Sequence, residues 1–157
     1  MRRKVKNRNI VNPDITYNSP KLAKFINYIM KEGKKSLARR LFDDTMAEMV
    51  KAGKKEPLKV FEMAIENVIP SMEVRPKRIG EGVYQVPVPV KPKRQIALAC
   101  RWILSATRGM KGSGFSKRLA QILMESADGT GPAMKKRDDV HRMAEANKTF
   151  AHLARFS

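Results

Sequence analysis

The chain has 157 residues, with 33 Lys and Arg against 15 Asp and Glu, and its formal net charge at pH 7 is therefore +18. Such an excess indicates a polyanionic partner, because a small domain needs far less charge to stay in solution. With 42% hydrophobic residues and Cys100 as the only cysteine, the chain is neither wholly disordered nor able to form an intramolecular disulfide. It has no apolar run near the roughly 18 residues of a membrane span and no secretory signal, so we expect a soluble intracellular protein without membrane contact.

The positive charge is concentrated in two parts of the chain. Residues 1–35 and 71–111 carry net charges of +8 and +7, whereas residues 36–70 are neutral and residues 112–157 carry +3. The first twelve residues hold five basic side chains and few apolar ones, and we therefore expect residues 1–12 to form a flexible basic arm.

A first helix is predicted to begin at Pro20, with Ser19 as its N-cap, and to stop at Gly33. Apolar residues recur at helical spacing between these two signals. The segment is therefore expected to bury one face in a core.

Two further helices follow. Ser36 is the expected N-cap of the second, which ends at Gly53, and Pro57 opens a third that Pro70 closes. The second helix is neutral and structural, and two i,i+4 ion pairs are expected on it, Arg39 with Asp43 and Arg40 with Asp44.

The pattern then changes from helical to alternating, which predicts a β-hairpin over residues 72–90. The two strands, 72–79 and 83–90, are joined by a three-residue loop from Gly80 to Gly82. In this register an apolar face places Met72, Val74 and Pro76 opposite Val90, Val88 and Val86. The other face is mostly basic and carries Glu73, Arg75, Lys77 and Gln85.

Prolines restrict how this ribbon pairs. Pro87 and Pro89 lack the N–H groups that would bond a third strand on one edge, so we expect an isolated two-stranded ribbon. Pro76 falls on the inner ladder in this register, and a bulge is expected there.

Helical periodicity returns after the hairpin. A fourth helix is predicted from about Lys93 to Arg108, and a fifth is marked by apolar residues from Phe115 to Leu123. The fourth helix carries a basic stripe at intervals of seven, formed by Arg94, Arg101 and Arg108.

The last segment, "KKRDDVHRMAEANKTFAH", follows the break "DGTGP" and holds both histidines. On one helix, His141 and His152 would lie roughly 16 Å apart along the axis, too far to share a zinc ion. We expect them instead in a cationic stripe suited to phosphates and bases, the alternative being an ordinary solvated face. The stripe comprises Arg137, His141, Lys148, His152 and Arg155. A different helical face is expected to gather Val140, Met143, Asn147, Phe150, Ala151 and Ala154.

Nothing in the sequence favours an active site, a metal site or a cofactor. The loop "GMKGSGFS" is not a phosphate-binding P-loop, because Phe115 stands where that motif needs lysine. Aromatic residues make up only 6%, which favours phosphate contacts and shape recognition over a platform for stacked bases.

Four segments, "GKKSLARRLF", "YQVPVPV", "ALACRWIL" and "KKRDDVHRMAEANKTFAH", closely resemble small-subunit ribosomal protein seven in its bacterial and organellar form. The likeness covers nearly the whole chain. It implies a mainly α fold, a single-domain bundle of about six helices over residues 1–157 with a protruding β-hairpin between the third and fourth helices. It also implies a non-catalytic ribosomal protein of the cytoplasm or an organelle, which binds the 3′ major domain of 16S rRNA and initiates assembly of the head.

In this family the hairpin and last helix border the exit (E) site for tRNA and the mRNA path, and we expect ribosomal proteins nine and eleven as neighbours. Carried over by position, the rRNA contacts are the arm residues Arg2, Arg3, Lys4, Lys6 and Arg8 and the turn and hairpin residues Lys34, Lys35, Arg75, Lys77 and Arg78. The expected set extends to Lys91, Lys93, Arg94, Arg101, Arg108, Lys111, Lys135, Lys136, Arg137 and Arg142. The residues expected near tRNA and mRNA are Lys77, Arg78, Gly80, Gly82, Tyr84, Lys148 and His152. The chain departs from the family at its end, where "LARFS" replaces a more aromatic terminus, and in its glycine-rich loops.

Two other classes of protein also carry a strong positive charge. A DNA-binding architectural protein also combines basic surfaces with a projecting ribbon, and an RNA-modifying enzyme is a more remote alternative. Competition between duplex DNA and structured RNA separates the first from the favoured class, and a turnover assay addresses the second.

Overall fold

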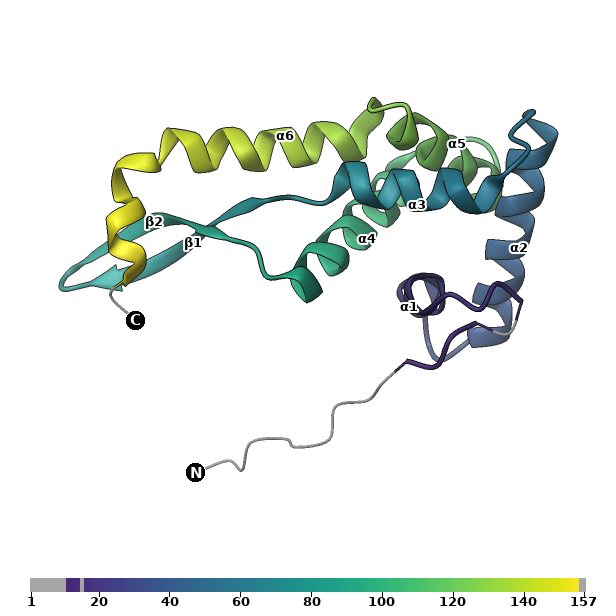
Figure 1. Cartoon of the computed structure of the whole chain (residues 1–157), viewed down its shortest axis with the longest axis horizontal. Coiled ribbons are helices and arrows are strands. Elements are labelled where there is room, and N and C mark those ends of the chain that lie inside the picture. Colours follow the sequence, from purple (N-terminus) through teal and green to yellow (C-terminus); the bar gives the residue numbers. More distant parts are fainter. Residues whose placement is uncertain (1–10, 15, 156–157) are drawn as a thin grey trace.

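The structure, a computed structural model, describes residues 11–14 and 16–155, and for residue 155 only the backbone. Six α-helices, a β-hairpin and a terminal 3₁₀ helix follow one another in this part of the chain (Figure 1). The order confirms the predicted mainly α bundle with a hairpin between the third and fourth helices. Nearly all of the predicted arm, residues 1–12, lies outside the described residues. The elements are α1 (Pro20–Ile29), α2 (Lys35–Lys51), α3 (Pro57–Val68), β1 (Met72–Ile79), β2 (Gly82–Pro89), α4 (Pro92–Gly109), α5 (Phe115–Ala127), α6 (Gly131–Ala146) and η1 (Lys148–Arg155).

The core forms where the apolar faces of the six α-helices meet. Phe25, Phe42 and Phe61 come one each from α1, α2 and α3, and all three are fully buried. Their rings meet edge to face, with centroids 5.1 to 6.0 Å apart. Burial of each such ring stabilises the fold by about 2 to 3 kcal/mol. This triad therefore fixes the first three helices to one another, and α4, α5 and the start of α6 complete the core.

Cys100 on α4 is buried in this core, as expected. Burial raises the pKa of its thiol to about 12. The thiolate is therefore scarce at neutral pH, and the side chain acts as a small apolar group. No helix among the described residues is both long and apolar enough to cross a bilayer.

The starts of the first two helices differ in how well they were predicted. The Ser19 hydroxyl accepts a hydrogen bond from the Leu22 amide at 3.4 Å, which confirms Ser19 as the N-cap of α1. The prediction for α2 was wrong, because α2 begins at Lys35 without a side-chain cap and Ser36 lies inside it.

The expected ion pairs on α2 are also wrong. Within the described residues neither Arg39 with Asp43 nor Arg40 with Asp44 forms an ion pair. Arg39 instead places its Nε 3.6 Å from Oδ1 of the buried Asp14. This contact ties the segment before α1 to α2, a long-range choice that helical spacing does not reveal.

The hairpin forms as predicted, but its register is shifted by one residue. Ile79 pairs with Gly82, so the turn has two residues instead of three, and Met72 pairs with Pro89. Opposite residues share a face, and Val86 and Val88 therefore lie on the same face as Glu73, Arg75, Lys77 and Tyr84. The predicted separation into an apolar and a basic face is therefore wrong.

The observed register explains all three strand prolines. The amide of Val90 donates to Ser71 O at 3.0 Å, so this pair is hydrogen-bonded. Bonded and non-bonded pairs alternate along an antiparallel ladder. Pro76, Pro87 and Pro89 consequently fall at non-bonded positions, where no inner N–H is needed. The ladder is continuous and the expected bulge at Pro76 is absent.

The last segment is not one helix. α6 ends at Ala146 and a 3₁₀ helix follows, so a single stripe from Arg137 to Arg155 does not form. Met143, predicted to lie on the face away from the stripe, is exposed, whereas Ala144, which was not assigned to that face, is buried. In Figure 1 the yellow η1 turns away from the line of α6 and lies beside the hairpin.

Candidate nucleic-acid interface

A buried carboxylate organises the base of the hairpin. Glu73 on β1 is only 6% exposed. It accepts hydrogen bonds from Nε of Arg75 at 2.7 Å and from Nε of Arg94 at 2.8 Å to each carboxylate oxygen. Two arginines on one carboxylate leave the cluster with a net positive charge, and both guanidinium side chains stay about half exposed.

The charge of Glu73 is held in place by these partners. Burial raises the pKa of the carboxyl, but hydrogen bonds and charges from Arg94 and Arg75 lower it by more, so the pKa falls below its ordinary value of 4.5. Glu73 is therefore ionised at neutral pH. Arg94 and Arg75, both predicted as RNA contacts, join α4 to β1 through it.

Within the described residues no third strand pairs with the hairpin, as predicted. The hairpin nevertheless does not stand alone, because the C-terminal segment binds it at its base and near its tip. We call the following three contacts the clasp. At the base of the hairpin, the amide of Ser71 donates to Nε2 of His141 (3.0 Å). Near the tip, the cross-strand partners Lys77 and Tyr84 make the other two contacts: Lys77 Nζ donates to the carbonyl of Ala154 (3.0 Å), and the Tyr84 ring packs on that of Phe150 (centroids 5.5 Å apart). The clasp makes the hairpin, α6 and η1 one structural unit (Figure 1).

α6 is in turn tied to the core. Arg137 donates from Nη1 to the carbonyl of Asn67 at 2.6 Å and pairs with Asp138 at 2.7 Å. The side-chain amide of Asn67 donates to the carbonyls of Ser126 and Ala127 at the end of α5. Asn67 thus holds α3, α5 and α6 together, and Arg137, predicted as an RNA contact, has a structural role.

The two histidines have separate roles. Nε2 of His141 accepts a hydrogen bond from the backbone N–H of Ser71 at 3.0 Å, whereas Nδ1 of His152 donates to Thr149 O at 2.9 Å. In the described part of the chain, no three His, Cys, Asp or Glu side chains are arranged to hold a metal ion.

Most other predicted cations lie at the surface. Some of them form ion pairs with acidic side chains that are also exposed, such as Lys34 with Glu32 at 2.8 Å and Lys148 with Glu145 at 3.0 Å. Exposed pairs of this kind contribute little stability, and a phosphate can displace the acid. The exposed predicted cations are Lys34, Lys35, Arg78, Lys91, Lys93, Arg101, Arg108, Lys111, Lys135, Lys136, Arg142 and Lys148. The predicted contacts of the arm all lie outside the described residues; they are Arg2, Arg3, Lys4, Lys6 and Arg8.

The turn of the hairpin has little bulk. Gly80 has a φ of +61°, which glycine adopts without strain. Tyr84 packs over Gly82, and a Cβ there would lie 2.9 Å from its ring. The tip therefore presents mainly backbone, and Arg78, which pairs with Val83, lies on the face opposite to that of Tyr84.

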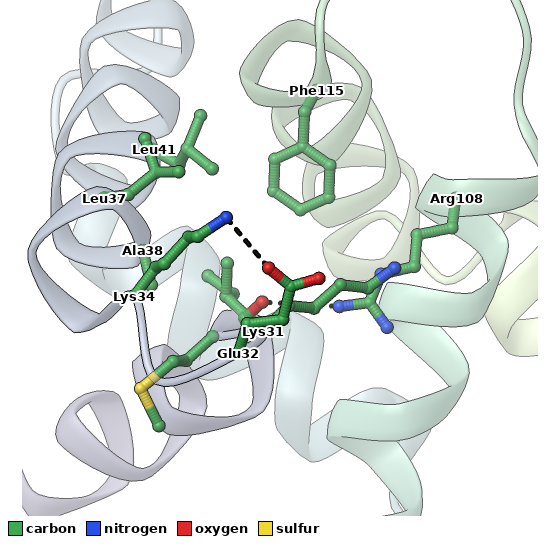
Figure 2. A pocket seen from close by; sticks show the side chains of 10 residues that line it. Lys31, Glu32, Lys34, Leu37, Ala38, Leu41, Arg108 and Phe115 are labelled. Atoms are coloured by element: carbon green, nitrogen blue, oxygen red, sulfur yellow. Dashed lines mark hydrogen bonds and ion pairs between the residues drawn. The ribbon is translucent and has the colours of Figure 1, made fainter.

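A pocket of about 380 Å³ lies where the ends of α1 and α4 meet the starts of α2 and α5. Its wall is mainly apolar and includes Leu37, Leu41 and Phe115, and Lys31, Lys34 and Arg108 are the cations that line it. Figure 2 shows the Phe115 ring, the Lys34–Glu32 ion pair and the Arg108 guanidinium around this space. Helical periodicity did not point to the pocket, because it assigns residues to a face and not to the junction of four helices.

Comparison with known proteins gives a consistent result. Residues 1–148 match the model of the family described as ribosomal protein S7p/S5e. The chain is 47% identical to the small ribosomal subunit protein uS7 of Hahella chejuensis, over 96% of its own length and 97% of the relative. It is 48% identical to the protein of that name from Dictyoglomus thermophilum, over 89% of the chain and 90% of the relative. For the one from Pseudothermotoga lettingae the identity is 47% over 97% of both.

These matches extend over the bundle, the hairpin and α6 alike, and they agree with the mainly α architecture and the strong positive charge. They favour neither the DNA-binding nor the enzymatic alternative. The chain therefore belongs to the ribosomal protein S7p/S5e family, as a structural, non-catalytic component of the small ribosomal subunit.

Proposed function

We propose that the chain is a primary rRNA-binding protein that binds the 3′ major domain of 16S rRNA, nucleates assembly of the head and borders the E site. The observation that carries the proposal is the distribution of exposed cations over α2, α4 and α6, around a core whose own helix faces are apolar. Residues 1–157 then act as one rRNA-binding domain, and its basic arm adds further phosphate contacts.

Anchoring on rRNA is assigned to the surface outside the hairpin tip. The exposed cations at the start of α2, along α4 and at the start of α6 lie on helices fixed to the core, so they are preorganised for a folded RNA. Arg94 and Arg75 contribute mainly by holding the hairpin base, and Arg137 by holding α6. This division differs from the prediction, which gave all these cations the same role.

The hairpin tip and the C-terminal segment are assigned to tRNA and mRNA. Both project from the bundle as the clasped unit (Figure 1), and Arg78, Lys148 and His152 are exposed on it. Their charges suit phosphates, and the Tyr84 and Phe150 rings suit a base. Small-subunit ribosomal proteins nine and eleven are proposed as neighbours, and cross-linking with mass spectrometry on reassembled subunits tests that assignment.

The anchoring proposal is tested by the salt dependence of binding to an rRNA fragment that contains the 3′ major domain. Each phosphate contact removed lowers the slope of log K against log salt by about 0.7 to 0.9. We expect the double variant Lys34→Gln, Lys35→Gln to lower this slope by the amount that corresponds to one or two phosphate contacts. The matched control is Lys59→Gln, which removes another exposed cation paired with an acid, Glu56, on the neutral part of the chain. Equal slopes for wild type, variant and control would contradict the anchoring role.

A further inference from the structure

The pocket between α1, α2, α4 and α5 combines an apolar interior with a cationic margin. Leu37 is 44% exposed although it is one of the larger apolar side chains of the chain, and it lines the pocket beside the Phe115 ring. Of the charged residues that line it, Lys31, Lys34 and Arg108 are positive and only Glu32 is negative. The pocket therefore suits a group that is flat and apolar but attached to an anionic chain.

We propose that this pocket receives a single unpaired nucleobase of the bound RNA, whose flanking phosphates lie on Lys34 and Arg108. The inference rests on the proposed rRNA-binding function and adds a defined site to it. The volume is at the small end of the range for ligand pockets, which excludes a helix or a strand as the occupant. A base within a duplex is stacked on both faces, so only a looped-out base enters.

The positive margin favours a base over an apolar side chain from another protein. Arg108 is held at the pocket by a hydrogen bond from Nη2 to the carbonyl of Ile29 at 3.3 Å, so its charge is fixed in position. Lys34 is bound to Glu32 at 2.8 Å across exposed surface. An arriving phosphate competes with the Glu32 carboxylate for Lys34, and exchange of one partner for the other keeps the lysine paired throughout.

The backbone beside the pocket holds Glu32 in an uncommon conformation. Its φ is +53°, in the left-handed region that non-glycine residues rarely adopt, and the next residue, Gly33, has a φ of +72°. These two residues form the tight turn between α1 and α2, which places Lys34 at the pocket margin. A Cβ at Gly33 would meet no other atom within 4 Å, so the role of this glycine is conformational and not a matter of space.

The test separates stacking from charge. Leu37→Gln makes the wall polar without adding charge, and its exposure makes a loss of folding a poor explanation for any effect. We expect binding to the 3′ major domain fragment to weaken about tenfold, because one stacked base contributes that order of affinity, with no change in the salt slope. The control is Val50→Gln on the same helix, since Val50 is 54% exposed and does not line the pocket. Lys34→Gln should instead lower the slope.

A photo-reactive benzoylphenylalanine in place of Phe115 gives an independent reading. Cross-linking to one unpaired nucleotide, whose base becomes protected from chemical modification when the protein binds, supports the proposal. Cross-links to a ribosomal protein, or scattered over paired nucleotides, would overturn it, as would Leu37→Gln binding as tightly as Val50→Gln. If the wild-type chain fails to bind the fragment at all, the proposed rRNA-binding function fails, which is a distinguishable result.

Discussion

Replacement of Arg94 by leucine tests whether this residue is chiefly a structural partner of Glu73. In the folded chain, Nε of Arg94 donates to both oxygens of a carboxylate that is 6% exposed. Hydrogen bonds to charged groups contribute about 1.5 to 3 kcal/mol, and loss of one partner of a buried pair costs about 3 to 5 kcal/mol. Arg94 is half exposed and Arg75 remains on the carboxylate, so we expect the lower part of this range, about 1.5 to 2 kcal/mol.

The assay is urea unfolding at pH 7, with calorimetry as a second measurement. A loss of that size lowers the midpoint temperature by roughly 3 to 8 °C for a chain of this length. The control is Lys93→Leu, which changes the adjacent exposed cation and should alter stability by less than about 0.5 kcal/mol. In a double-mutant cycle with Glu73→Gln, we expect a coupling of about 1 kcal/mol or more.

The pH dependence of that coupling provides a further check. The pKa of Glu73 lies below 4.5 in the folded chain, so the unfolded chain takes up the proton at a higher pH than the folded one. The stabilisation is therefore complete above the ordinary value and is lost as pH falls through the lower folded pKa. If Arg94→Leu costs no more than Lys93→Leu, or if the coupling is the same at neutral and acid pH, the assignment of Arg94 to the fold is refuted.

Three other changes give separate readings. Asn67→Ala removes the amide that binds two carbonyls at the end of α5 and should lower the free energy of unfolding by about 1 to 2 kcal/mol in urea, against almost no change for Lys59→Ala on the exposed face of the same helix. His141→Ala should speed hydrogen exchange at the Ser71 amide with a stability loss of about 1 kcal/mol or less, and unaltered exchange would show that this hydrogen bond does not persist in solution. Replacement of residues 77–84 by a short glycine link should spare incorporation into subunits and reduce tRNA retention in the E site or reading-frame maintenance; subunits that fail to incorporate the variant would make the tip an rRNA anchor.

Local signals were sufficient for most of the helices. Ser19 with Pro20, and Pro57, mark helix starts through backbone geometry that acts within a few residues, and the structure follows them. Ser36 failed as a cap, although it is a good N-cap residue in isolation. Local preference is a weak guide where the preceding turn, here Glu32 and Gly33, sets the direction of the chain.

The hairpin shows a different limit. An alternating pattern fits two registers that differ by one residue almost equally well, because valines lie on one face of β2 and prolines, with Val83, lie on the other. The prolines distinguish the two, since only a two-residue turn places Pro76, Pro87 and Pro89 at non-bonded positions. Side-chain pattern alone selected the wrong register, although the misfit of Pro76 signalled the right one.

The candidate site was predicted as one set of cationic residues. In the structure, some of them bind partners within the fold and others are exposed. Charge counting cannot distinguish Arg94 and Arg137, which bind partners distant in sequence, from Lys93 and Lys136, which are exposed. The partner Glu73 was visible only as one acidic residue on a strand. Contacts between elements depend on the packed arrangement and have no signature within a short window.

The clasp has a mechanical consequence for the hairpin. A ribbon of two strands bends easily, whereas one braced at several points by α6 and η1, with α6 itself fixed at Asn67, resists bending as a strut does. Thermal fluctuations of the tip are then small, and a force applied there is transmitted through α6 to the ends of α3 and α5. Substitutions at Asn67 or Arg137, which both lie outside the hairpin, would loosen the tip without altering any residue in it.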